Sequence, residues 1–521
     1  MAEPFYITTA INYPNGRPHI GHAYEGIATD VMARFQRLRG RDVRFVTGTD
    51  EHGLKMDQTA RNQGRATIDL ADEMSGYFRD MAGKLNLSYD AFVRTTEDRH
   101  KAASVELWKR MEANGDLYLD RYEGWYSVRD EAFYDESELV EGEGGAKLSP
   151  QGTPVEWTAE ETWFFRLSNY EEKLLAHYRD NPEFIRPESR RNEVLRFVEG
   201  GLKDLSVSRT SFDWGVPVPD SEGHVMYVWV DALTTYMTGV GFPDADGADF
   251  QRYWPADIHM IGKDITRFHT VYWPAFLMSA GLPLPKQVFS HGFLLARGGE
   301  KMSKSAGNVV DPLELAEQFG VDNLRYFFMR EIAFGQDGSY SPEAIVNRCN
   351  AELANSFGNL AQRTLSMIAK NMDGKLETFE QADDDQSLLA KVREACAKAL
   401  PREFEQLAFS VGIEAWMRAV FACNQYVDEQ APWGLKKTDP ERMKAVLQTL
   451  FMAIRDLAIA IQPVVPEKAD AVLDMLGIPA DARSYSDLED DDWFARLVDA
   501  GHTLDAPSPV FPRLEMPVEA E

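Results

Sequence analysis

The protein has 521 residues, of which 44 % are hydrophobic and 27 % are charged, and its formal net charge is −29. This length is sufficient for three or four domains, and the composition is typical of folded proteins rather than disordered ones. No apolar run is long enough to predict a membrane span, and the N-terminal residues show no signal or transit peptide. Three cysteines exclude a disulfide framework, so we expect a cytoplasmic protein. The negative charge argues against indiscriminate coating of nucleic acid but does not exclude a local binding patch.

The N-terminal region predicts a parallel β-α-β unit. A buried strand is expected over residues 5–11, then a turn-rich loop, a helix from about residue 24 to 39, and a strand over 43–50. This order of elements is typical of a parallel sheet. Further strands are expected in three apolar segments, each followed by polar residues: 224–233, 256–265 and the stretch that begins at residue 288.

Two other regions differ from this pattern. Residues 118–225 combine short aromatic-rich strands with an acidic, glycine-rich turn, which predicts a domain inserted into the α/β sheet. From about residue 341 the apolar residues recur with the helical period, which predicts a helical bundle. One stripe of this bundle is expected to contain Leu353, Phe357, Leu360, Thr364 and Met367.

The predicted fold class is therefore α/β, with a parallel sheet split by an insertion and followed by an all-α part. We expect the sheet domain in residues 1–117 and 226–296, the insertion in 118–225, a connecting region in 297–350 and the helical part in 351–521. No low-complexity linker precedes the helices, so they are expected to pack tightly on the sheet domain. The acidic run at 487–493 is interpreted as a solvated tail.

The segment His19-Ile20-Gly21-His22 lies where a strand is predicted to give way to a helix. In open α/β sheets ligands bind at this edge, and a helix N-terminus attracts phosphate. Two imidazoles at this spacing can point at one group, and Gly21 between them leaves room for a flat base. A metal pair and two ordinary loop histidines remain alternatives at this point.

A second basic motif, Lys301-Met302-Ser303-Lys304-Ser305, follows Gly298-Gly299. Two ammonium groups on a loop can neutralise the charge that develops when a polyphosphate leaves. A short basic run is more often a solvated surface segment. Its occurrence together with the histidine motif favours a nucleotide site.

The two motifs, HIGH at 19–22 and KMSKS at 301–305, resemble those of class I aminoacyl-tRNA synthetases. The insertion is too short for the large editing domain of the isoleucine, valine and leucine enzymes. Several longer segments are similar to the methionyl-tRNA synthetase family: 7–25, 45–53, 227–233, 259–269, 300–312, 356–363 and 428–433. This resemblance covers nearly the whole chain. It implies a Rossmann-like catalytic domain, a connective-peptide insertion and an anticodon-binding bundle.

The resemblance also implies a methionine site. Asp50 would hold the α-ammonium group of methionine by a charge-assisted hydrogen bond, although a loop-capping role is the alternative. The pocket for the side chain would be lined by Ile11, Tyr13, Trp229, Ala232, Leu233, Tyr236, Ile265 and His269. Such an aromatic cavity suits a thioether. Plain core packing is the alternative for Trp229 and Tyr236, and where this chain has Leu233 some relatives have proline.

For ATP, which would bind with Mg²⁺, the resemblance implies two groups of residues. His19, His22, Lys301 and Lys304 would contact the phosphates, with Met302 and Ser303 in the same motif. Gly21, Glu25, Gly262 and Asp264 would face the adenosine. The implied reaction is activation of methionine to methionyl-adenylate, with release of pyrophosphate, followed by transfer to the terminal adenosine of tRNA(Met).

In the helical part, Asn359 and Arg363 are one helical turn apart and are expected to share an exposed face. With Trp433 they would read and stack the anticodon of tRNA, as the resemblance implies. A surface ion pair and a tryptophan that seals the bundle are the alternatives.

The chain departs from many relatives in the insertion. Ser127 and Asp130 stand about where those relatives have the cysteines of a zinc knuckle, and all three cysteines lie in the last third of the chain. We therefore expect no structural zinc. We also expect a monomer, because an appended tRNA-binding dimerisation domain has no counterpart here.

Three other functions would share some of these features. A nucleotidylyltransferase would share only the HIGH motif, and a cysteine-specific synthetase would need cysteine ligands for zinc. A catalytically inactive, tRNA-binding paralogue is expected to have lost His19, Asp50, Lys301 or Lys304, and all four are present.

Overall fold

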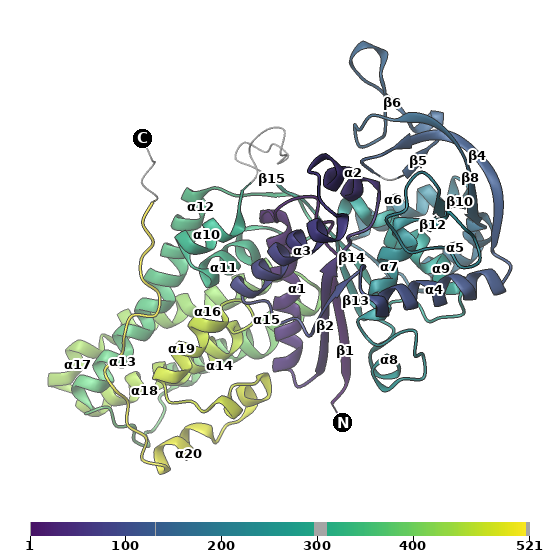
Figure 1. Ribbon diagram of the computed structural model, residues 1–521. Coiled ribbons are helices and arrows are strands. Elements are labelled where there is room, and N and C mark those ends of the chain that lie inside the picture. The colour runs from purple at the N-terminus through teal and green to yellow at the C-terminus, as the bar shows by residue number, and fades with distance from the viewer. Residues whose placement is uncertain (1, 131, 296–309, 517–521) are drawn as a thin grey trace.

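The computed structural model describes residues 2–130, 132–295 and 310–516 (Figure 1). At its centre is a six-stranded parallel sheet with the strand order β3-β2-β1-β13-β14-β9. Its strands are β1 (Pro4–Thr9), β2 (Asp42–Thr49), β3 (Ala91–Arg94), β9 (Ile185–Arg186), β13 (Ile258–Gly262) and β14 (Val288–His291). The predicted split α/β fold is confirmed.

Alternation along the strands separates two cores. Phe5 and Ile7 of β1 face α1 (Ile20–Leu38) and join a core that continues into the C-terminal helices. Tyr6, between them, belongs to the core on the other face of the sheet. Successive side chains of a strand point to opposite faces, so both faces of this sheet are buried. The remaining helices of the sheet domain are α2 (Leu54–Asn62), α3 (Thr67–Lys84), α4 (Asp98–Ala113), α7 (Val228–Thr238), α8 (Ala248–Tyr253) and α9 (Trp273–Ser279).

The prediction of a strand over residues 224–233 is wrong for most of these residues. Only Val225–Met226 form a short strand, β12, and the chain then enters helix α7. All of α7 except Trp229 is buried. An apolar run with no polar face has no visible helical period, so a buried helix and a buried strand look alike in sequence.

The inserted region forms a second, antiparallel sheet at the end of the molecule opposite the helical bundle (Figure 1). Its long strands are β4 (Leu117–Ser127) and β8 (Glu156–Phe165), with β5 (Ala132–Tyr134) and β10 (Leu205–Ser206) at the edges. Between β8 and β10 lie helices α5 (Glu171–Asp180) and α6 (Glu188–Glu199). Strand β9, which separates these helices, pairs with β14. Part of the region predicted as an insertion therefore completes the edge of the central sheet.

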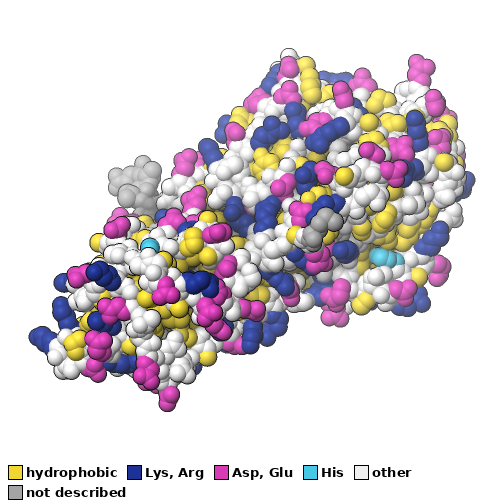
Figure 2. All heavy atoms as spheres, turned by 90° about the horizontal axis from the view of Figure 1, so that it is seen from below, with side chains coloured by type: hydrophobic (Ala, Val, Ile, Leu, Met, Phe, Trp, Pro, Cys, Tyr) yellow, Lys and Arg dark blue, Asp and Glu magenta, His cyan; other side chains and the backbone are white. Residues whose placement is uncertain are grey.

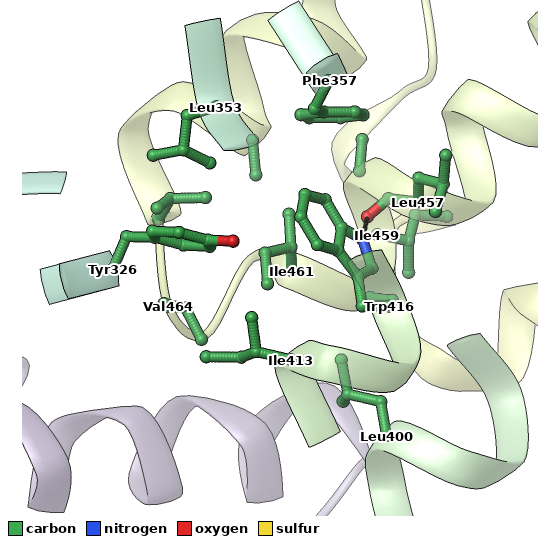
Figure 3. Packing of buried hydrophobic residues seen from close by; sticks show 14 of the residues in the cluster. Tyr326, Leu353, Phe357, Leu400, Ile413, Trp416, Leu457, Ile459, Ile461 and Val464 are labelled. Carbon is green, nitrogen blue, oxygen red and sulfur yellow. Dashed lines mark hydrogen bonds between the residues drawn. The ribbon is translucent and has the colours of Figure 1, made fainter. Parts of the chain in front are cut away.

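The helical part begins with α10 (Pro312–Phe319) and α11 (Val321–Glu331), which connect it to the sheet domain. The bundle itself contains α12 (Pro342–Cys349), α13 (Asn359–Asn371), α14 (Asp383–Arg393), α15 (Leu400–Glu405), α16 (Phe409–Gln430), α17 (Pro432–Thr438), α18 (Pro440–Ile461) and α19 (Pro466–Met475). Figure 3 shows Trp416 of α16 at the centre of its core, where the indole Nε1 donates to the Leu457 carbonyl over 2.9 Å. Of the predicted stripe, Met367 alone is only partly buried.

The acidic C-terminal region is not simply a solvated tail. Tyr485 and Leu488 are buried against the bundle, and the Tyr485 hydroxyl donates to the Ala460 carbonyl over 2.7 Å. Helix α20 (Trp493–Asp499) follows, and Phe511 packs against Phe357. The acidic side chains are therefore carried by a segment whose apolar residues are part of the core. In Figure 2, basic and acidic side chains alternate over the face of the molecule seen from below.

A buried ion pair joins α1 to the C-terminal helices. The Arg325 guanidinium of α11 lies 2.7 Å from the Asp30 carboxylate of α1, and both side chains are fully buried. Arg325 also donates to the carbonyls of Val464 and Pro463, at 3.0 and 2.9 Å. Asp30 in turn accepts from the backbone N–H of Ser88 over 2.6 Å.

No helix in the described part of the chain is both long and apolar enough to cross a membrane.

We expect Arg325→Met to lower the stability of the protein by about 3 kcal/mol or more, because removing one member of a buried ion pair strands its partners. Lys286→Met is the control, since Lys286 pairs with Asp257 at the surface. Thermal unfolding of both variants measures the difference. Equal shifts in melting temperature would show that the buried pair adds nothing.

Candidate active site

A cavity of about 370 Å³ opens at the carboxyl ends of β1 and β13. These neighbouring strands mark the point where the strand order reverses, since the chain continues from β1 to β2 on one side and from β13 to β14 on the other. The loops after the two strands diverge there, which leaves a crevice for a ligand. The sheet topology thus determines where the cavity lies.

Every described residue predicted to bind methionine or ATP lines this cavity. They are Ile11, Tyr13, His19, Gly21, His22, Glu25, Asp50, Trp229, Ala232, Leu233, Tyr236, Gly262, Asp264, Ile265 and His269. Lys301, Met302, Ser303 and Lys304 lie outside the described residues.

The two histidines of the HIGH motif form the N-terminus of α1. His19 is the N-cap residue: its Nδ1 accepts from the Gly21 N–H over 3.1 Å, and its own N–H donates to His22 Nδ1 over 3.0 Å. This reciprocal capping begins the helix at Ile20, earlier than predicted. Because both Nδ1 atoms accept, each neutral ring carries its hydrogen on Nε2 as a donor. A Cβ at Gly21 would lie 2.9 Å from the His19 ring, so glycine is needed there.

Glu25 is engaged within the protein. One carboxylate oxygen accepts from the Ala10 N–H over 2.9 Å, and the other lies 2.8 Å from His291 Nε2. Burial opposes the charged form of His291, but the hydrogen bond and charge of Glu25 outweigh it and raise the pKa of this imidazole. His291 was not among the predicted site residues, although a histidine at the end of a predicted strand was a usable signal.

The apolar part of the cavity is formed largely by α7. Trp229 stacks on Phe268 with ring centroids 3.8 Å apart, and Ala232, Leu233 and Tyr236 follow on the same helix. The Tyr236 hydroxyl lies 2.6 Å from His269 Nε2. The Trp229 side chain is partly exposed to the cavity, which distinguishes it from a residue that only fills the core.

His269 is a neutral, oriented imidazole. Its Nδ1 lies 3.0 Å from the Ile265 carbonyl, which can only accept, so Nδ1 carries the hydrogen and Nε2 accepts from Tyr236. Burial lowers the pKa of His269 to about 4. The cavity wall therefore carries no positive charge at this position near neutral pH.

A buried network connects the two sides of the cavity. Asp231 of α7 bonds to His52 over 2.5 Å and to His100 of α4 over 2.6 Å. Burial opposes its ionisation, but the two imidazoles outweigh this and lower the pKa of Asp231. His52 is two residues from Asp50, so the network holds the Asp50 loop against α7. Neither His52 nor His100 was a predicted site residue.

In the insertion, hydroxyl groups and one carboxylate join two turns. The Asp130 carboxylate accepts from Ser149 and Thr153, each over 2.6 Å, and Ser127 lies 2.6 Å from Thr153. We call Ser127, Asp130, Ser149 and Thr153 the hydroxyl cluster. Among the described residues no group of three or more His, Cys, Asp or Glu side chains is arranged to hold a metal ion. Three residues of these turns, Arg129, Asp130 and Gln151, line the cavity.

The residues predicted to bind an anticodon lie far along the chain, in the bundle. Asn359 and Arg363 are both exposed on α13. Trp433, in the first turn of α17, is 51 % exposed, so it does not seal the bundle. The Arg363 guanidinium lies 5.5 Å from the centre of the Trp433 ring. An exposed aromatic ring beside a cation can accept a stacked base.

Comparison with known proteins identifies the family. The family model of class I tRNA synthetases (M) matches residues 5–365, and that of the anticodon-binding domain of methionyl tRNA ligase matches residues 377–519. The chain is 56 % identical to the methionine–tRNA ligase of Brucella suis biovar 1 (strain 1330), over 98 % of both chains. The chain belongs to the methionine–tRNA ligase family of class I tRNA synthetases. The resemblance in the sequence is thereby confirmed.

Solved structures from this family have the same fold. The methionyl-tRNA synthetase of Mycobacterium tuberculosis bound by methionyl-adenylate superimposes with a TM-score of 0.93 at 54 % identity, covering 98 % of this chain and all of that one. Its free-state structure gives a TM-score of 0.88 at 52 % identity, with 99 % of each chain covered. Members of this family are aminoacyl-tRNA ligases, so the chain is assigned to an enzyme family.

The buried neutral His269 predicts how stability depends on pH. Between about pH 6.5 and pH 4 the unfolded chain binds a proton at this histidine that the folded protein does not, so stability falls as the pH is lowered through this range. His269→Asn removes this contribution. We expect the melting temperature of the unsubstituted protein to fall more between pH 7 and pH 4.5 than that of the variant. Parallel decreases would contradict the prediction.

Proposed function

We propose that the protein activates L-methionine with ATP, forming methionyl-adenylate and pyrophosphate, and then transfers methionine to the 3′-terminal adenosine of tRNA(Met). The observation that carries this proposal is the convergence of the HIGH histidines, Asp50 and the aromatic wall of α7 on one cavity. The family membership and the adenylate bound to the mycobacterial relative support it.

Methionine would bind between Asp50 and α7. The Asp50 side chain is 8 % exposed and lines the cavity, so an ammonium group there would meet a carboxylate in a largely desolvated place. The thioether would lie among Trp229, Tyr236 and the neutral His269. The Asp231 network fixes the distance between the ammonium site and this wall. Positioning of this kind favours substrates whose length matches it.

ATP would bind with Mg²⁺ across the N-terminus of α1. His19 and His22 can donate from Nε2 to phosphate oxygens, and the helix dipole favours the same charge. Gly21 and Gly262 leave space for the adenosine, and the exposed Asp264 carboxylate is suited to the ribose hydroxyls. Glu25 would face the adenosine as well, and its contacts with the Ala10 backbone and His291 hold its carboxylate in place.

The KMSKS residues Lys301 and Lys304 would bind the phosphates from the other side. The chain leaves the described region at Leu294–Leu295, with Leu294 in the wall of the cavity. It returns at Val310, whose carbonyl accepts from the Ile20 N–H of α1 over 3.1 Å. Both flanking residues are thus close to the HIGH motif. The chemical step needs no covalent enzyme intermediate: the carboxylate of methionine attacks the α-phosphorus, and the pyrophosphate leaves.

A monomeric state and a cytoplasmic location complete the proposal. The small number of cysteines supports the location, and the lack of cysteines in the inserted region supports the absence of a structural zinc ion.

Methionine-dependent exchange of pyrophosphate into ATP tests the activation step. We expect exchange with methionine and with no other amino acid, and Asp50→Asn should reduce kcat/KM for methionine by roughly ten- to 100-fold, because a charged hydrogen bond is worth about 1.5–3 kcal/mol. Asp257→Asn is the control: Asp257 accepts from the Tyr6 N–H at the opposite end of the sheet. A folded protein that binds tRNA but supports no exchange would instead be the inactive paralogue.

Aminoacylation kinetics test the anticodon site. Trp433→Ala and Arg363→Ala should each raise KM for tRNA(Met) by about tenfold or more, because stacking on an aromatic ring is worth about 1–3 kcal/mol per base. Exchange involves no tRNA, so the ratio of the two activities isolates the effect. Arg418→Ala, which removes an exposed arginine of α16, is the matched control. Equal effects of Arg363→Ala and Arg418→Ala would contradict the assignment.

A further inference from the structure

The inserted domain contributes a cation to the catalytic cavity. Arg129 follows the end of β4 by two residues, has an exposed side chain and lines the same cavity as His19 and His22. Gln151, from the facing turn, lines it too. Within residues 2–130, 132–295 and 310–516, no carboxylate forms an ion pair with this guanidinium.

The hydroxyl cluster fixes the turn that carries Arg129. Ser127 and Asp130, on either side of it, are both tied to Thr153 of the facing turn. The Asp130 N–H also donates to Ser127 Oγ over 3.2 Å, which closes the turn on itself. Ser127, Ser149 and Thr153 are buried, so water does not compete for these bonds. A charge on such a turn is positioned before the substrate arrives.

The chemistry of the cavity indicates what Arg129 meets. A planar guanidinium with several donors matches the oxygens of a phosphate group. The histidine donors lie at the N-terminus of α1, and Arg129 approaches from the inserted domain. The cavity would therefore present donors to an anionic group from two different parts of the chain.

We propose that Arg129 is a further catalytic residue, which binds a phosphate group in the cavity. Two substrates of the proposed reaction carry one: the triphosphate of ATP in the activation step, and the terminal nucleotide of tRNA in the transfer step. The inference rests on the proposed function, and it adds a residue from outside the HIGH and KMSKS motifs. Asp130 acts as a positioning residue for it.

The experiment compares Arg129→Ala and Arg129→Lys with Arg121→Ala. Arg121 is an exposed arginine on β4 of the same domain and does not line the cavity. Two rates are measured: methionine-dependent pyrophosphate exchange as a function of MgATP, and single-turnover transfer from preformed enzyme-bound adenylate to tRNA(Met). Melting temperatures check that the variants are folded. We expect them to fold, because the Arg129 side chain is exposed.

We expect Arg129→Ala to reduce one of the two rates by about tenfold or more, the size expected for a lost charged hydrogen bond. Arg129→Lys should retain more of the rate, because it keeps the charge. A loss in kcat/KM for MgATP identifies the phosphate as that of ATP, and a loss confined to transfer identifies it as that of tRNA. Both rates within twofold of those of Arg121→Ala overturn the inference.

Two further results distinguish the positioning role of Asp130, the phosphate contact of Arg129 and the proposed function. Asp130→Asn removes a negative charge near an anionic substrate, so charge alone would increase the affected rate. A decrease supports the positioning role of the hydroxyl cluster, and an increase or no change overturns that role. If the unsubstituted protein itself shows no exchange with methionine, the proposed function fails, whereas normal exchange with unaffected Arg129 variants rejects only the present inference.

Discussion

The buried contact between Asp30 and Arg325 is the constraint on which the arrangement of the molecule depends. Asp30 lies on the helix whose first turn carries the HIGH histidines, and Arg325 reaches the carbonyls between α18 and α19. A buried ion pair needs all its hydrogen bonds to repay the loss of hydration, and here both ions have them. Helix α1 is thus held in one position relative to the bundle, and the two form one core.

The same principle operates beside the cavity. Asp231 receives hydrogen bonds from two histidines, one beside Asp50 and one on α4. The loop that would hold an ammonium group and the helix that forms the apolar wall are therefore joined by buried hydrogen bonds. Tyr236 and His269 add a second fixed contact in that wall. Ligand specificity in such a cavity comes from distances that the protein sets before binding.

The insertion shows how oxygen atoms can join two turns. A carboxylate that accepts from two buried hydroxyls connects residues 127–130 with residues 149–153. The missing cysteines were visible in the sequence and excluded a tetrahedral thiolate site there. The hydrogen bonds that join the two turns were not predictable, because serine, threonine and aspartate are common at exposed turns. Only their burial distinguishes this cluster from ordinary turn residues.

The sequence by itself indicated the split α/β fold and the helical C-terminal part, because the order of elements and apolar periodicity are local properties. Its motifs resembled one family, and that resemblance implied many of the residues that line the cavity, although not Arg129, Gln151 or His291. The tertiary structure decided the rest. It made 228–238 a helix, placed β9 in the central sheet and packed the acidic tail on the bundle. It also paired Asp231 with His52 and His100, which lie 179 and 131 positions earlier in the chain. Such hydrogen-bond partners depend on which helices and loops pack together, and the residues adjacent in the chain do not indicate this packing.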